Sequence, residues 1–206
     1  MIVAVINTKG GVGKTTTCMY LAEAARRAGR RVTVWDADPQ GSSLTWSDQA
    51  AADEAPIPYS VVGVHQRRLT RAAATQAGGD VLIDTPPGDP QIISRAVEAA
   101  DIAVVVTGPG GADVERAMET MDHYTGTTPA LLLLTQYIKQ EKDSWTTWQS
   151  LRSSDYPVFD TRIPRRAAIQ RSYGATIDDD LHGYERLLDE IVHVLDELNA
   201  EGDSDG

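Results

Sequence analysis

The chain has 206 residues, of which 41% are hydrophobic and 24% charged, as expected for one α/β domain with a full-sized core. Its formal net charge of −11 repels phosphate, so any contact with nucleic acid has to come from a local basic patch. The single cysteine, Cys18, excludes an internal disulfide and suits a reducing compartment. We expect neither a signal peptide nor a membrane segment, because no basic residue precedes the apolar N-terminal run and no apolar run is long enough.

The first predicted strand, Ile2 to Ile6, leads into a glycine-rich turn and then into a helix from Thr15 to Ala28. Strand, glycine-rich turn and helix is the context that a phosphate-binding loop requires. Glycines let several N–H groups approach one anion, and the helix adds the positive end of its dipole. The stretch therefore predicts a phosphate site made of Lys9, Gly10, Gly11, Val12, Gly13, Lys14, Thr15 and Thr16.

Two side chains of this loop are expected to carry the chemistry. Lys14 would reach the β- and γ-phosphates of a nucleotide, and the Thr15 hydroxyl would ligate Mg²⁺. An ordinary glycine-rich turn between a strand and a helix is the alternative, but it would not need the complete string in this context.

Acidic residues follow at the ends of two later predicted strands. The strand Val32–Trp35 ends in Asp36-Ala37-Asp38-Pro39-Gln40, and the strand Asp80–Asp84 continues into Thr85-Pro86-Pro87. Carboxylates at the carboxyl edge of a parallel sheet lie where α/β proteins bind ligands, and an apolar strand ending in Asp is the Walker B arrangement that holds Mg²⁺. A simple Asp-Pro turn and an ordinary buried strand are the alternatives.

The remaining elements continue an alternation of strands and helices. Helices are predicted around Leu44 and Trp46 and over 66–77, 90–100 and 114–124, and strands over 59–62, 102–107 and 130–135. Trp145 and Trp148 share a helical face, which favours packing or a protein contact over chemistry. The pattern predicts a single P-loop NTPase domain over residues 1–200, with a mostly parallel sheet and helices on both faces.

The C-terminal part holds the one strongly basic segment of this acidic chain. Residues 161–171 contain four arginines and no acidic residue: Arg162, Arg165, Arg166 and Arg171. They are either a DNA contact or a solvated helix start that neutralises Asp178–Asp180. Residues 183–199 predict an amphipathic helix whose acidic polar face argues against a membrane surface, and residues 201–206 predict a disordered acidic tail.

The three nucleotide motifs together resemble those of the ParA/MinD ATPases. In that family the phosphate loop is a deviant Walker A box, whose first lysine reaches the nucleotide of a dimer partner. The chain most resembles the short, single-domain plasmid partition ParA proteins, which lack an N-terminal DNA-binding domain, so we expect no such domain here. The resemblance implies that Lys9 makes the contact across the dimer.

The resemblance also assigns roles to other residues. It implies that Lys9, Lys14 and Asp38 are catalytic, with Asp38 as the carboxylate that positions the attacking water. It implies that Thr15, Asp36 and Asp84 surround Mg²⁺ beside the phosphates. The segment from Thr161 to Arg165 resembles the family's Thr-x-Ile-Pro-Arg stretch, which implies that Pro164 lies near the adenine of ATP.

For function, the resemblance implies a slow, partner-stimulated ATP hydrolase of plasmid or chromosome partition that requires Mg²⁺. The ATP state would be a cytoplasmic homodimer, or a higher polymer, that lies on the nucleoid through nonspecific DNA contacts of Arg162, Arg165, Arg166 and Arg171. A centromere-binding ParB-like protein would stimulate hydrolysis, and no membrane would take part. Two alternatives stay open: a ParA-like ATPase that positions another protein cargo, and a nucleotide-dependent binding module with negligible turnover.

Two stretches depart from the family pattern. Relatives tend to carry Thr-Pro-x-x-x-Asp, where this chain has the looser, glycine-rich stretch Thr107–Asp113. Larger relatives place an Asn-Arg pair where this chain has Gln136-Tyr137. The dimer interface near Gly108–Ala112 is therefore not carried over residue by residue.

Overall fold

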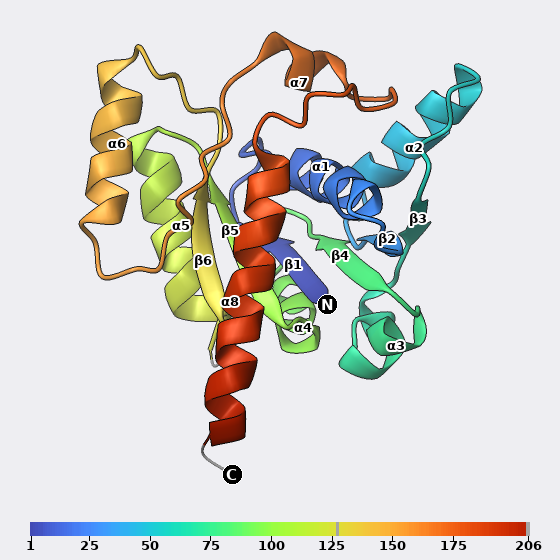
Figure 1. The fold of residues 1–206 in the computed structure, drawn as a ribbon, viewed down its shortest axis with the longest axis horizontal. Coiled ribbons are helices and arrows are strands. Elements are labelled where there is room, and N and C mark those ends of the chain that lie inside the picture. Colours follow the sequence, from blue (N-terminus) through green and yellow to red (C-terminus); the bar gives the residue numbers. More distant parts are fainter. Residues whose placement is uncertain (127, 205–206) are drawn as a thin grey trace.

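The computed structural model describes residues 1–126 and 128–204, with the backbone alone for residues 202–204. Its strands form one parallel sheet in the order β3-β2-β4-β1-β5-β6 (Figure 1). The strands are β1 (Ile2–Ile6), β2 (Val32–Asp36), β3 (Ser60–Gly63), β4 (Asp80–Asp84), β5 (Ile102–Thr107) and β6 (Ala130–Leu134). Because β1 pairs with both β4 and β5, the turn that follows it opens at the middle of the carboxyl edge.

Helices cover both faces of the sheet. One face is covered by α1 (Lys14–Arg27), α2 (Ser42–Ala52) and α8 (Tyr184–Ser204), and the other by α3 (Arg71–Gln76), α4 (Pro90–Ala99), α5 (Gly111–Tyr124) and α6 (Lys142–Arg152). The short helices η1 (Gln66–Arg68) and α7 (Ala167–Arg171) lie in connections. Among the described residues, no helix combines the length and the hydropathy that a membrane span requires.

The central strand shows why both faces need cover. Val3 and Val5 pack into the core under α1 and α8, whereas Ile2, Ala4 and Ile6 pack into the core under α4 and α5. Successive side chains of a strand point to opposite faces, so a strand covered on both sides has an apolar residue at every position. All five residues of β1 are accordingly buried.

An irregular segment, residues 157–165, runs parallel to the outer edge of β6. Phe159 N donates to Leu132 O at 3.0 Å, Ile163 N donates to Leu134 O at 2.9 Å, and Arg165 N donates to Tyr137 O at 2.9 Å. From α8, the Glu190 carboxylate accepts from Asp160 N and Thr161 N at 2.8 Å each. The segment is thus held between the sheet and the last helix.

The predicted fold class is confirmed, with every paired strand parallel. Two local predictions were wrong. The predicted helix over 66–77 is split, because Thr70 accepts from Ala73 N and caps a new helix after η1. The predicted disordered tail begins too early, because α8 continues through Ser204; residues 205 and 206 lie outside the described residues.

Candidate nucleotide site

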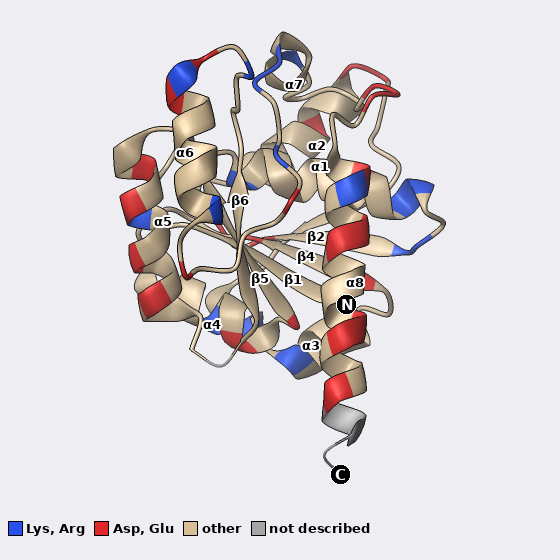
Figure 2. Cartoon of the chain, turned by 60° about the vertical axis from the view of Figure 1, so that its left-hand side comes forward, with Lys and Arg blue, Asp and Glu red and all other residues tan. Residues whose placement is uncertain are grey.

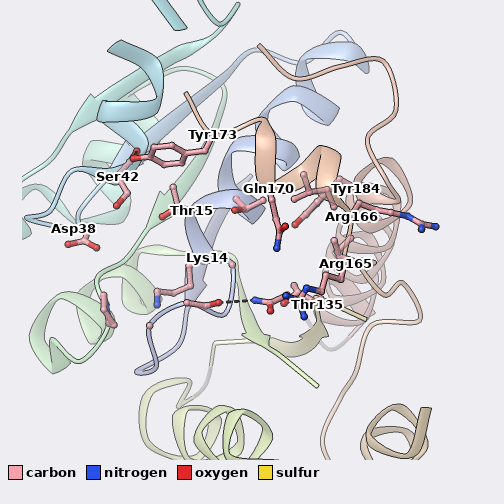
Figure 3. Close-up of a pocket in the computed structure, with 18 of the residues that line it drawn as sticks. Lys14, Thr15, Asp38, Ser42, Thr135, Arg165, Arg166, Gln170, Tyr173 and Tyr184 are labelled. Atoms are coloured by element: carbon pink, nitrogen blue, oxygen red, sulfur yellow. Dashed lines mark hydrogen bonds between the residues drawn. The ribbon is translucent and has the colours of Figure 1, made fainter. Parts of the chain in front are cut away.

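The glycine-rich turn after β1 forms the floor of a cavity of about 660 Å³ at the carboxyl edge of the sheet (Figure 3). Gly11 has φ 77° and Gly13 has φ 99°, left-handed values that a residue with a Cβ adopts with strain. Gly13 is also the N-cap of α1, so the first N–H groups of α1 open toward the cavity. A turn with this backbone has the geometry that an anion site requires.

Lys14 lies at the start of α1 with 7% of its surface exposed. Its ammonium donates to the Lys9 carbonyl at 2.9 Å across the turn. Burial lowers its pKa, while Asp84 and Asp38 act in the opposite direction. A buried ammonium beside this turn is stabilised strongly by a bound phosphate, because the negative charge of the phosphate compensates for the hydration that the ammonium lost on burial.

Asp84, at the end of β4, faces the same loop and is 1% exposed. Its Oδ2 accepts from the Ser43 hydroxyl at 2.7 Å, whereas its Oδ1 is buried without a hydrogen-bond partner among the described residues. Desolvation raises its pKa to about 6, and the Ser43 and Thr15 hydroxyls offset part of this. A buried oxygen without a partner beside a threonine hydroxyl fits a Mg²⁺ site, since Mg²⁺ prefers hard oxygen ligands.

Asp36 and Asp38 have different tasks in the structure. Asp36 is 2% exposed, and its two oxygens accept from Asp38 N at 3.1 Å and Leu44 N at 2.9 Å. It therefore shapes the turn between β2 and α2, and its charge helps to raise the pKa of Asp84. Asp38 lines the cavity, where its predicted role toward the attacking water stays a prediction (Figure 3).

The predicted cross-dimer residue, Lys9, forms an ion pair with Asp113 of the same chain. Asp113 belongs to the glycine-rich stretch that departs from the family pattern. A Cβ on Gly108 would lie 2.5 Å from Asp113 Oδ2, and one on Gly110 would lie 3.2 Å from it. The glycines of this loop thus make room for the carboxylate that holds Lys9.

The end of β6 supplies two contacts to the phosphate loop that the sequence analysis missed. The Thr135 hydroxyl donates to Val12 O at 2.7 Å, and Gln136 Nε2 donates to Gly11 O at 2.8 Å (dashed in Figure 3). Gln136 has φ 54°, an uncommon value for a residue with a side chain. Its departure from the Asn-Arg pair of larger relatives was the one signal that pointed to this position.

The far end of the cavity is formed by segment 157–165, α7 and the start of α8. Pro164 lines it together with Ile163, Gln170, Tyr173 and Tyr184, and its place near the adenine stays a prediction. Tyr184 is held in place by its hydroxyl, which lies 3.2 Å from the Thr17 hydroxyl of α1. The cavity therefore has a charged end at Lys14 and Asp38 and an apolar end made by Ile163, Pro164 and Tyr184, beside which Arg165 and Arg166 also line it. A nucleotide needs both kinds of surface.

The four arginines of the basic segment do not act as one group. Arg165, Arg166 and Arg171 are exposed, and the first two also line the cavity. In Figure 3 the Arg166 side chain extends away from Lys14 and Thr15. Arg162 is half-buried between two aromatic rings, so its geometry argues against the predicted DNA contact.

Comparison with known proteins agrees with this geometry. Residues 3–177 match the family described as CobQ/CobB/MinD/ParA nucleotide binding domain. The chain belongs to this family. It is 34% identical over 176 residues to maintenance of carboxysome distribution protein A of Gloeobacter kilaueensis, covering 83% of this chain and 80% of the relative. It is 30% identical over 243 residues to the chromosome-partitioning ATPase Soj of Thermus thermophilus, covering 95% and 96%.

Solved structures show the same fold. A protein assigned to plasmid partition from Borrelia burgdorferi, bound to AMPPNP, has a TM-score of 0.73 at 15% identity, covering 93% of this chain and 98% of that one. Other solved proteins with this fold hold ADP or an ATP analogue with magnesium. The chain is thus a ParA/MinD-family protein related to partition and carboxysome-positioning ATPases.

Proposed function

We propose that this chain is a Mg²⁺-dependent ATPase of partition type, which dimerises around ATP and binds DNA without sequence preference. One observation carries the nucleotide part of the proposal: Lys14, Thr15, Asp38 and Asp84 converge on one loop, and within the described chain Asp84 keeps a buried oxygen without a hydrogen-bond partner. In such a switch, the γ-phosphate stabilises the dimer and its DNA contacts, and slow hydrolysis releases both.

Each group has a physical task in this proposal. The loop N–H groups and Lys14 bind the phosphates, and Asp38 orients the attacking water. Thr15 and Asp84 would hold Mg²⁺, which neutralises phosphate charge when bound, with Asp36 as a neighbouring charge. Ile163 and Pro164 contact the base, and Tyr184 closes the apolar end.

Replacing Asp38 separates binding from turnover. We expect Asp38→Ala to lower phosphate release at saturating Mg·ATP by about 100-fold or more, since a positioned general base contributes on the order of 100- to 10,000-fold. The ATP dissociation constant is expected to stay within about threefold, because Lys14 and the loop amides are unchanged. Asp48→Ala, an exposed carboxylate on α2, is the matched control. Unchanged turnover in Asp38→Ala contradicts the assignment.

The DNA contact is tested by binding to random-sequence duplex DNA in the nucleotide-free, Mg·ADP and non-hydrolysable Mg·ATP states. We expect tight, salt-sensitive binding with the ATP analogue alone. Figure 2 shows why the contact must be local: acidic positions recur along α8, whereas basic positions occur at the end of α6 and in the loops beside α7. Three arginines predict that log K falls with log[salt] at a slope of about −3 per protomer.

Single substitutions then test which arginines take part. Arg171→Gln is the cleanest, because Arg171 is exposed and does not line the nucleotide cavity. It should lower the salt slope by about one per protomer and leave ATP affinity unchanged. Arg95→Gln, which removes an exposed charge from α4, should change neither. A flat salt dependence in the parent protein rules out this surface as the DNA contact.

Positioning of a protein cargo is the second candidate, favoured by the 34% identity to a protein named for carboxysome distribution. Both candidates share ATP-dependent DNA binding and differ in the partner that stimulates turnover. A partner that must be bound to a specific DNA site supports partition, in a cytoplasmic, nucleoid-associated cycle. A partner that stimulates without specific DNA supports cargo positioning.

A further inference from the structure

The half-buried arginine of the basic segment, Arg162, lies in an aromatic clamp. Its guanidinium carbon is 4.8 Å from the centroid of the Tyr137 ring and 4.6 Å from that of the Trp148 ring. Its Nη1 is buried without a hydrogen-bond partner in the part of the chain that the structure describes. A planar guanidinium suits this place, because it is weakly hydrated and can stack on two rings at once.

The three members of the clamp come from different parts of the chain. Tyr137 follows β6 and is 8% exposed, Trp148 lies on α6, and Arg162 lies in segment 157–165. The guanidinium carbon of Arg152 also lies 5.7 Å from the centroid of the Trp148 ring. The other tryptophan of α6, Trp145, is 46% exposed, so the two tryptophans that share a predicted face have separate environments.

The clamp is directly connected to the apolar end of the nucleotide cavity. Tyr137 follows Gln136, which lines the cavity, and Arg162 precedes Ile163 and Pro164, which line it from the other side. Between these two segments, Tyr137 N donates to Ile163 O at 3.0 Å, and Arg165 N donates to Tyr137 O at 2.9 Å. The clamp thus lies beside the backbone pairing that holds Ile163 and Pro164 next to the residues that follow β6.

We propose that Arg162 is a positioning residue for the nucleotide base: stacked between Tyr137 and Trp148, it fixes Ile163–Pro164 against Gln136. The inference rests on the proposed nucleotide function and adds a role that lies outside the phosphate loop. Arg162 does not line the cavity, so it acts through the residues beside it. Its charge serves the stack with the rings, and DNA binding is assigned to the exposed arginines.

The test is Arg162→Gln, which removes the cation and keeps a polar side chain of similar reach. We expect KM for ATP to rise about fivefold, with kcat within about twofold of the parent value, since loss of two stacked contacts loosens the base end and spares Lys14 and Asp38. A purely structural loss of folded protein would instead lower kcat and leave KM unchanged. The salt slope of DNA binding should stay at the parent value.

Arg116→Gln is the control, because Arg116 is an exposed arginine of α5 that pairs with Glu119 and lies outside both the cavity and segment 157–165. It should leave KM for ATP within about twofold of the parent. Arg162→Lys, which keeps the charge without the planar stack, should give an intermediate KM. If Arg162→Gln does not fold, Trp148→Phe supplies the second measurement, with an expected rise in KM of about twofold.

Two outcomes overturn the inference. One is an unchanged KM for ATP in Arg162→Gln, or in Trp148→Phe where that variant replaces it. The other is a salt slope of DNA binding lowered by about one per protomer, which makes Arg162 a phosphate contact. The parent protein separates the two levels of proposal: if the parent does not bind Mg·ATP, the proposed function fails, whereas normal ATP binding with insensitive variants overturns the clamp alone.

Discussion

Asp84→Asn is expected to raise the melting temperature of the nucleotide-free protein at pH 7 by about 2–4 °C and to lower Mg-dependent turnover by about 100-fold or more. Asp84 is 1% exposed, and one of its oxygens has no hydrogen-bond partner in residues 1–126 and 128–204, so its charge is costly without a cation. An amide removes that charge and, with it, the ligand that Mg²⁺ requires. Stability and activity are therefore expected to change in opposite directions at this position.

The pKa of Asp84 determines how the stabilisation by Asp84→Asn changes with pH. Burial raises the pKa of Asp84 to about 6, above the ordinary value of 3.8. A group with a raised folded-state pKa contributes stability that is present below its unfolded pKa and is lost as the pH rises through about 6. The difference in melting temperature between Asp84→Asn and the parent should therefore shrink from pH 7 to pH 5, where the parent carboxyl is protonated.

Calorimetry or thermal denaturation across this pH range, together with a phosphate-release assay, checks both halves. Asp48→Asn makes the same substitution at an exposed position of α2 and should change neither quantity. A lower melting temperature for Asp84→Asn at pH 7 would mean that the hydrogen bond from Ser43 outweighs the desolvation of the charge.

Lys9→Ala is expected to abolish ATP-dependent dimerisation while leaving one nucleotide bound to each monomer. The ammonium is 40% exposed and pairs with an Asp113 carboxylate that is 21% exposed, so it can exchange this partner for a phosphate of a second protomer. Sedimentation with a non-hydrolysable ATP analogue measures the dimer, and nucleotide titration measures binding. Lys142→Ala, an exposed lysine of α6, is the control.

Asp113→Ala probes the same contact from the other side. Removing the carboxylate frees Lys9 from its partner within the chain, so the dimer is expected to form about two- to fivefold more tightly, the range of a partly exposed ion pair. A Lys9→Ala dimer of normal strength would falsify the cross-dimer role. A dimer weakened by Asp113→Ala would instead give Asp113 a direct role in the interface.

The sequence by itself determined the features that depend on contiguous residues. The phosphate loop could be predicted because its glycines, Lys14 and Thr15 adjoin one another, and because Gly11 and Gly13 adopt the left-handed backbone that such a turn needs. The parallel sheet could be predicted because strands covered on both faces are apolar at every position. The prediction of one helix over 66–77 was wrong. The cap at Thr70 that divides it is also a local signal, but it competes with the helix propensity of the residues around it.

The tertiary structure alone decided which distant groups share a site. Lys9 meets Asp113, Asp84 meets Ser43, and Gln136 meets the carbonyl of Gly11. Arg162 looked equivalent to its three neighbours, until the fold placed it between the rings of two separate elements. An arginine on a solvated surface and one in an aromatic clamp have the same local sequence signature, because desolvation is a property of the packed chain.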